Sequence, residues 1–227
     1  MIITIDGPAG SGKSTAARKL AARLGIAYLD TGAMYRAVAL AVLRESVSLD
    51  DVQSLMGVAE QSDIVLDCGP TYTRVTLNGV DVSEAIRSMA VNGATNYVAR
   101  VPQIRVLLVE KQRGIGRDLG SLVSEGRDQG SVVFPDANLK FVLDATIDKR
   151  ATRRFQELVA EGEDASLEDI MENLRNRDRN DQKQWAPLLE PSRATIIDTT
   201  KMTIHEVVEK LVEEVEHLRN RASPALR

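Results

Sequence analysis

Eight residues near the start of the chain have the types and spacing of a phosphate-binding loop. Residues 7–14 read GPAGSGKS, which fits the pattern G-x-x-x-x-G-K-[ST]. Glycines let the backbone wrap so that its N–H groups converge on phosphate oxygens. Lys13 would reach the β- and γ-phosphates, and Ser14 would offer its hydroxyl to Mg²⁺. The sequence therefore predicts a site for a nucleoside triphosphate with Mg²⁺, formed by Gly7, Pro8, Ala9, Gly10, Ser11, Gly12, Lys13, Ser14 and Thr15.

Arginines lie where a second phosphorylated ligand could bind. Arg127 follows a predicted strand, and Arg36 lies in the second predicted helix. Open α/β sheets bind ligands beyond the carboxyl ends of their strands, where Arg127 is expected. Converging arginines suit a reaction between two phosphorylated substrates, because the negative charges must be brought together. Other arginines lie on two charged helices, for which a solvated, salt-bridged face is the alternative: Arg150, Arg153, Arg154, Arg175, Arg177 and Arg179.

The elements that must position these residues alternate between strands and helices. Short apolar runs at residues 2–5, 27–29, 122–124, 140–143 and 194–197 predict buried strands, and residues 13–24 and 33–44 predict helices. This alternation indicates an α/β fold with a parallel sheet of about five strands. Residues 64–66, 73–77 and 80–82 predict a small antiparallel meander, because Asn78-Gly79 is a strong hairpin signal.

Composition limits the function further. The 227 residues include 43% hydrophobic and 27% charged residues, with a net charge of −4. A general nucleic-acid or anionic-membrane binder would carry a basic excess, so we expect neither kind of partner. The longest apolar run, residues 37–43, is far shorter than the roughly 20 residues of a membrane helix. One cysteine, Cys68, excludes an internal disulfide, which favours a cytoplasmic location.

Several motifs in the same order resemble those of bacterial cytidylate kinases. Besides the phosphate loop they are LDTGAMYR at residues 29–36, LNGVDVS at 77–83, EGRDQGSVVFP at 125–135 and APL at 186–188. The resemblance covers residues 2–215 and implies a P-loop NTPase-type parallel sheet flanked by helices, with an inserted monophosphate-binding region and a lid. We expect the core at residues 1–47, 102–156 and 167–227, the insert at 48–101 and the lid at 157–166.

The resemblance also implies roles for individual residues. Lys13, Arg127, Arg177 and Arg154 would be catalytic, and Arg150 with Arg154 would contact ATP phosphates from the lid. The residues that would bind the acceptor nucleotide are Thr31, Arg36, Asn96 (or its neighbour Thr95), Arg113, Arg127, Asp128, Arg177 and Asp181. Gln184 replaces an arginine that is usual in the family.

Within that set, Arg113 and Asp128 would read the base. Cytosine presents acceptors at O2 and N3 and a donor at N4, which match a guanidinium and a carboxylate. Uracil reverses the pattern at N3 and O4, so it would leave Asp128 facing an acceptor.

The resemblance implies ATP-dependent phosphorylation of CMP and dCMP by direct in-line transfer in a monomer. Two alternatives stay open at this point. A small-metabolite kinase of the shikimate or gluconate type has a phosphate loop but needs neither the insert nor the base-reading residues. A non-catalytic nucleotide-binding protein would not need the many arginines outside the loop.

Overall fold

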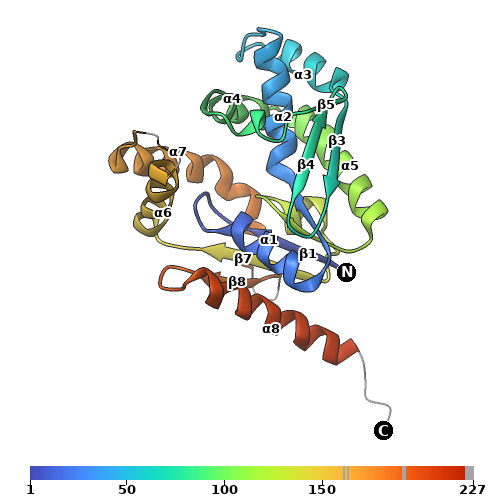
Figure 1. The fold of residues 1–227 in the computed structure, drawn as a ribbon, viewed down its shortest axis with the longest axis vertical. Coiled ribbons are helices and arrows are strands. Elements are labelled where there is room, and N and C mark those ends of the chain that lie inside the picture. Colours follow the sequence, from blue (N-terminus) through green and yellow to red (C-terminus); the bar gives the residue numbers. More distant parts are fainter. Residues whose placement is uncertain (161, 163, 191–192, 223–227) are drawn as a thin grey trace.

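The computed structural model is built on a five-stranded, all-parallel sheet (Figure 1), as the sequence predicts. It describes residues 1–160, 162, 164–190 and 193–222, and at residues 180–185 and 222 the backbone alone. The strand order is β2-β6-β1-β7-β8. The strands are β1 (Ile2–Asp6), β2 (Ala27–Asp30), β6 (Leu122–Glu125), β7 (Leu139–Asp144) and β8 (Thr195–Asp198).

Helices cover both faces of this sheet. Helices α1 (Lys13–Leu24) and α8 (Ile204–Ala222) pack on one face, where Leu20 and Leu211 are fully buried. Helix α5 (Pro102–Leu119) and the π-helical turn η2 (Gln129–Val133) cover the other, around Leu122. The two apolar layers fix the sheet, so the loops at the carboxyl ends of its strands have a rigid base.

A second unit follows β2. It contains α2 (Thr31–Arg44), α3 (Val52–Gln61), the antiparallel sheet β3 (Ile64–Cys68), β4 (Thr73–Leu77) and β5 (Val80–Asp81), η1 (Ala85–Arg87) and α4 (Met89–Ala99). Asn78 and Gly79 both have positive φ, 50° and 80°, as the tight β4–β5 turn requires. The predicted meander is therefore confirmed, and its own apolar core packs on α2.

Helices α6 (Ile147–Ala160) and α7 (Leu167–Trp185) form an arm that leads into η3 (Ala186–Leu189). In Figure 1 the arm and the α2–α4 unit stand on the same side of the sheet, and α8 lies on the opposite side. The expected lid, residues 157–166, is the tip of this arm, and its residues 161 and 163 lie outside the described residues.

Local capping sets two helix starts. Helix α2 begins at Thr31 rather than at residue 33, because the Asp30 side chain accepts a hydrogen bond from the Ala33 N–H at 3.0 Å. At α8, Thr203 and Glu206 bond to each other reciprocally and form a capping box. In the part of the chain that the structure describes, no helix has both the length and the hydropathy needed to cross a membrane.

Gly7 lies where the phosphate loop packs closely on the sheet, so a substitution at Gly7 tests that packing. Its φ is +135°, and a Cβ atom there would lie 2.1 Å from the carbonyl oxygen of Leu143. We expect Gly7→Ala to lower the free energy of unfolding by about 3 kcal/mol or more, since both overpacking and backbone strain oppose it. Gly93→Ala is the control, because Gly93 lies in α4 with open space around it. That change should stabilise the protein by up to about 1 kcal/mol. Equal urea midpoints for the two variants would contradict this packing.

Candidate active site

Charged side chains gather, buried, at the carboxyl ends of β1, β2 and β6. Asp6 ends β1, Asp30 ends β2 and Glu125 ends β6, and Lys13 and Asp128 lie in the segments that follow strands. All five are at most 7% exposed. Burying so many charges is costly unless they contact one another or a ligand. Their concentration at one edge marks this edge as the candidate site.

The phosphate loop occupies the β1–α1 connection, as predicted. Gly10 and Gly12 have φ of 75° and 89°, a region that favours glycine. Helix α1 starts directly at Lys13, so its free N–H groups face the loop. The Lys13 ammonium donates to the carbonyl oxygen of Pro8 at 2.7 Å.

The Lys13 ammonium has other cations around it. The pKa of Lys13 is lowered to about 7, first by burial and then by the positive charges of Arg127 and Arg177, whereas Glu125 and Asp6 oppose the shift. Arg127 Nη1 also donates to the carbonyl oxygen of Gly7 at 2.6 Å. The structure thus brings Lys13, Arg127 and Arg177 together, as expected from the sequence. An anion bound among them would relieve their mutual repulsion.

Glu125 is a site residue that the sequence analysis missed. Its Oε1 accepts from the Ser14 hydroxyl at 2.8 Å and from the Tyr28 hydroxyl at 3.4 Å. Burial raises the pKa of Glu125, and the nearby Asp30 carboxylate adds to that effect. The only sequence signal was an acidic residue at the end of an apolar strand. The hydroxyl of Ser14 and the carboxylate of Glu125 are the oxygen donors that a hard cation such as Mg²⁺ prefers, so this pair fits the ion.

Thr31 and Arg36 lie in the first turns of α2, directly after the end of the neighbouring strand β2. The Thr31 hydroxyl donates to the backbone carbonyl oxygen of Glu125 at 2.8 Å. Arg36 Nη2 donates to Asp30 at 2.7 Å, and Arg87 lies 4.0 Å from the same carboxylate. Among the described residues, the buried Nε of Arg36 has no hydrogen-bond acceptor. This group can still bind an anion beside Thr31.

Arg113, which we expect to read the base together with Asp128, is bonded in this structure to its own helix α5 and to η2. Its guanidinium donates to the carbonyl oxygens of Val132 and Val133 and to Glu110. The guanidinium that pairs with Asp128 belongs to Arg105, eight residues earlier on α5 and about 12 Å away along the helix axis. The two arginines share one helix, and sequence spacing alone does not tell which of them faces Asp128.

A pocket of about 260 Å³ opens beside Arg105 and Asp128. Ser131, Val132, Pro187 and Leu188 are among its other lining residues. It therefore combines the ion pair and two further cations, Lys140 and Arg193, with apolar groups from Val132, Pro187 and Leu188, and a few polar groups among apolar ones are typical of small-molecule sites.

Arg150, one of the arginines of the arm, bonds to protein groups in this structure. It is buried, and its three nitrogens donate to Ala145, Ala9 and, with both Nη atoms, the Asp178 carboxylate. Through these contacts Arg150 ties α7 to the phosphate loop, and its contact with ATP phosphates stays a prediction.

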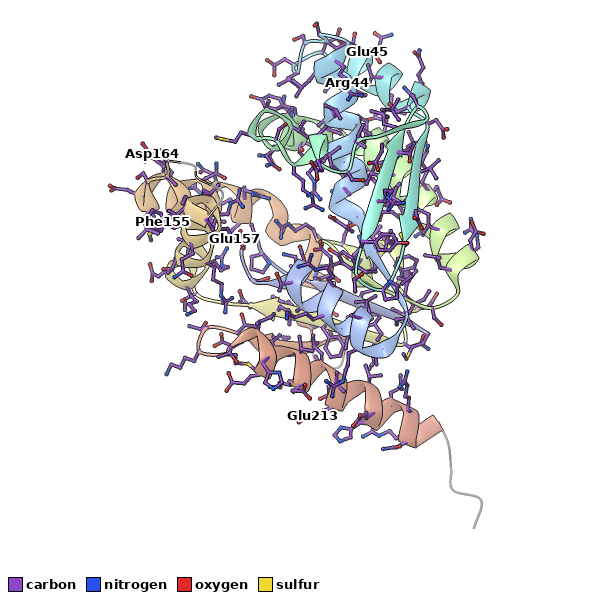
Figure 2. All side chains as sticks on the ribbon, viewed as in Figure 1. Arg44, Glu45, Phe155, Glu157, Asp164 and Glu213 are labelled. Carbon is purple, nitrogen blue, oxygen red and sulfur yellow. The ribbon has the colours of Figure 1, made fainter. Side chains whose placement is uncertain are left out.

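Two neighbours of Arg150 differ from it. Arg153 donates to the Ser11 carbonyl oxygen at 3.3 Å. Arg154 pairs with Glu157 at 3.1 Å and is 38% exposed, and Figure 2 shows Glu157 on the arm. Arg154 therefore keeps a position from which it could reach a ligand.

The structure describes the side chains of Thr95 and Asn96, but not those of Asp181 and Gln184. Thr95 donates its hydroxyl back to the Val91 carbonyl oxygen of its own helix at 2.6 Å, and the Asn96 side chain is exposed. Asp181 and Gln184 lie on α7, but their side chains fall outside the described residues.

The sequence model for cytidylate kinase matches residues 3–217. The chain belongs to the cytidylate kinase family. It is 47% identical to a cytidylate kinase of Caldanaerobacter subterraneus, covering 94% of this chain and 93% of that one. It is 40% identical to a cytidylate kinase of Geobacter sulfurreducens, covering 99% and 96%.

Two other matches add context. A bifunctional pantoate ligase/cytidylate kinase of Synechococcus is 43% identical over 99% of this chain, which covers 42% of that protein. Among solved structures, an uncharacterized protein of Eubacterium ventriosum aligns with a TM-score of 0.52 at 13% identity, covering 95% of this chain and 98% of that one. That likeness concerns the fold alone.

The low pKa of Lys13 predicts proton uptake when a triphosphate binds. At pH 8 a group with a pKa of about 7 is mostly neutral, and bound phosphates favour its charged form. We expect ATP binding at pH 8 to take up close to one proton at Lys13. Calorimetry in buffers of different ionisation enthalpy measures this number. Lys13→Arg is the control, because its guanidinium is already charged. Equal uptake by both proteins would contradict the assignment to Lys13.

Proposed function

We propose that the protein transfers the γ-phosphoryl group of ATP directly to the phosphate of CMP or dCMP, forming ADP and the nucleoside diphosphate. One observation carries this: Arg127, on the acceptor side, bonds to Gly7 of the phosphate loop and faces Lys13. Two bound phosphates would therefore meet over a single cluster of cations. Family membership supports the choice of acceptor.

On the donor side, the loop N–H groups and Lys13 would hold the ATP phosphates. Ser14 and Glu125 would hold Mg²⁺, with the remaining ligands coming from phosphate oxygens and water. When bound, the ion neutralises developing charge on the transferring group. In the described part of the chain no group of three acidic, histidine or cysteine side chains is placed so that it could hold a metal ion by itself.

On the acceptor side, Arg36, Arg127, Arg177 and Thr31 would bind the CMP phosphate, and Asp181 the ribose hydroxyls. Asp128 would accept from the N4 amino group of cytosine, and Arg105, in place of Arg113, would donate to the acceptors of the ring. The ion pair between Arg105 and Asp128 supports this change.

No residue needs to carry the phosphoryl group, since positioning and charge stabilisation suffice for transfer between two bound phosphates. The insert and the lid would close over the substrates and exclude water, and Arg154 would then reach the ATP phosphates. All of these groups come from one chain, so we expect a monomer to be active.

The acceptor is tested by measuring ADP formation from Mg²⁺ and ATP with CMP, dCMP, UMP, AMP and shikimate in separate assays. We expect turnover with CMP and dCMP to exceed turnover with UMP by about tenfold to a hundredfold, because uracil leaves Asp128 against an acceptor. Preferred use of shikimate would instead indicate a metabolite kinase, and no ADP with any acceptor would indicate a non-catalytic binder.

Arg105 and Arg113 form a matched pair for testing base recognition. Arg105→Ala should lower kcat/KM for CMP by at least about tenfold and reduce the preference for CMP over UMP, because the base and Asp128 both lose a donor. Arg113→Ala removes the same charge from the same helix and should leave the preference within about twofold of wild type. Steady-state kinetics with both acceptors measures this ratio. The reverse ranking of the two variants would restore Arg113 as the base-reading residue.

A further inference from the structure

Gln129, a residue with no assigned role so far, lies at the centre of the acceptor side. It directly follows Asp128 and is 1% exposed. Its Oε1 accepts from the Ser124 hydroxyl at 2.7 Å. Its Nε2 faces three oxygens: Thr31 Oγ1 at 3.2 Å, and Gln112 Oε1 and Asp128 Oδ1, both at 3.3 Å. One buried amide therefore touches both the expected base reader and an expected phosphate ligand.

The side chain of Asp6 holds the backbone of Gln129 in place. The two carboxylate oxygens of Asp6 accept from the N–H groups of Gln129 at 2.7 Å and Gly130 at 2.8 Å. Asp6 is fully buried. A Cβ atom on Gly130 would lie 2.7 Å from Thr4 Oγ1, so the turn sits directly on β1. The backbone position from which the Gln129 side chain extends is thus set by β1, the strand that leads into the phosphate loop.

Hydrogen-bond partners also fix which way the amide points. A carboxylate only accepts, so the end of the amide that faces Asp128 is the NH₂ group, which also points to Thr31 and Gln112. The other end is the carbonyl oxygen, to which the Ser124 hydroxyl donates. The Thr31 hydroxyl donates its own hydrogen to the Glu125 carbonyl oxygen, so toward Gln129 it acts as an acceptor. An amide has two N–H bonds for these three oxygens.

The two oxygens of the Asp128 carboxylate are held from different sides. Oδ2 pairs with Arg105, and Oδ1 receives the Gln129 amide. With both in place the carboxylate plane cannot rotate without breaking a buried hydrogen bond.

We propose that Gln129 is a positioning residue for acceptor specificity: its amide orients the Asp128 carboxylate toward the N4 amino group of the base and links it to Thr31. This inference rests on the proposed function. A lost hydrogen bond to a buried carboxylate corresponds to about tenfold or more in binding.

The test compares Gln129→Met and Gln129→Glu with wild type. Methionine keeps the length of the side chain without hydrogen bonds, and glutamate keeps the acceptor for Ser124 without the N–H donors. Both should raise KM for CMP and lower the CMP to UMP ratio of kcat/KM by about tenfold, and KM for ATP should stay within about twofold. Gln112→Met is the matched control: it is equally buried and removes a partner of the same amide, but it leaves the donors to Asp128 and Thr31.

Thermal melting of each variant separates positioning from general loss of stability. A Gln112→Met protein with the same fall in melting temperature should keep the wild-type CMP to UMP ratio. The inference is overturned if the Gln129 variants keep the wild-type ratio, or if Gln112→Met lowers that ratio equally. A wild-type protein that does not phosphorylate CMP would instead refute the proposed function.

Discussion

The hydrogen bond from Arg127 to the Gly7 carbonyl oxygen ties the two halves of the site together, because it joins the segment after β6 to the phosphate loop after β1. It also holds a second positive charge near the buried Lys13, whose pKa is lowered by burial and, in addition, by this charge. Such an arrangement is stable only with anions nearby, which here are Glu125 and Asp6 in the protein itself. Substrate phosphates would add to these anions. The fold therefore holds the cations that would bind the phosphates in position before the substrates arrive.

Glu125 extends these hydrogen-bonded connections between the two halves of the site to the end of the neighbouring strand β2. Its side chain accepts from Ser14, a donor-side residue, and its backbone carbonyl oxygen accepts from Thr31, an acceptor-side residue. Gln129 continues the chain of contacts from Thr31 to Asp128. The Ser14 hydroxyl, which we propose as a metal ligand, and the Asp128 carboxylate, which we propose as a base reader, are thus connected through three buried residues. The parallel sheet makes this possible, because only parallel strands bring their carboxyl ends to one edge.

Local patterns made most of the fold predictable from the sequence. The strands, helix α1, the β4–β5 turn and the phosphate loop all depend on short-range spacing and on glycine, so they were found in place. The partners of long side chains depend on tertiary packing. The sequence therefore did not distinguish Arg105 from Arg113 on α5, and it did not reveal that Asp178 would pair with Arg150. Glu125 and Asp6 were missed because a single acidic residue at a strand end is a weak signal.

The account depends on both substrates binding at one edge and reacting without a phosphorylated enzyme. The stereochemistry of transfer tests this directly. ATP made chiral at the γ-phosphorus with sulfur and oxygen isotopes would be reacted with CMP, and the configuration of the CDP product determined. One in-line displacement inverts the configuration at phosphorus, so inversion is the predicted result. Retention would require two displacements through a phosphorylated side chain and would contradict direct transfer over Lys13 and Arg127.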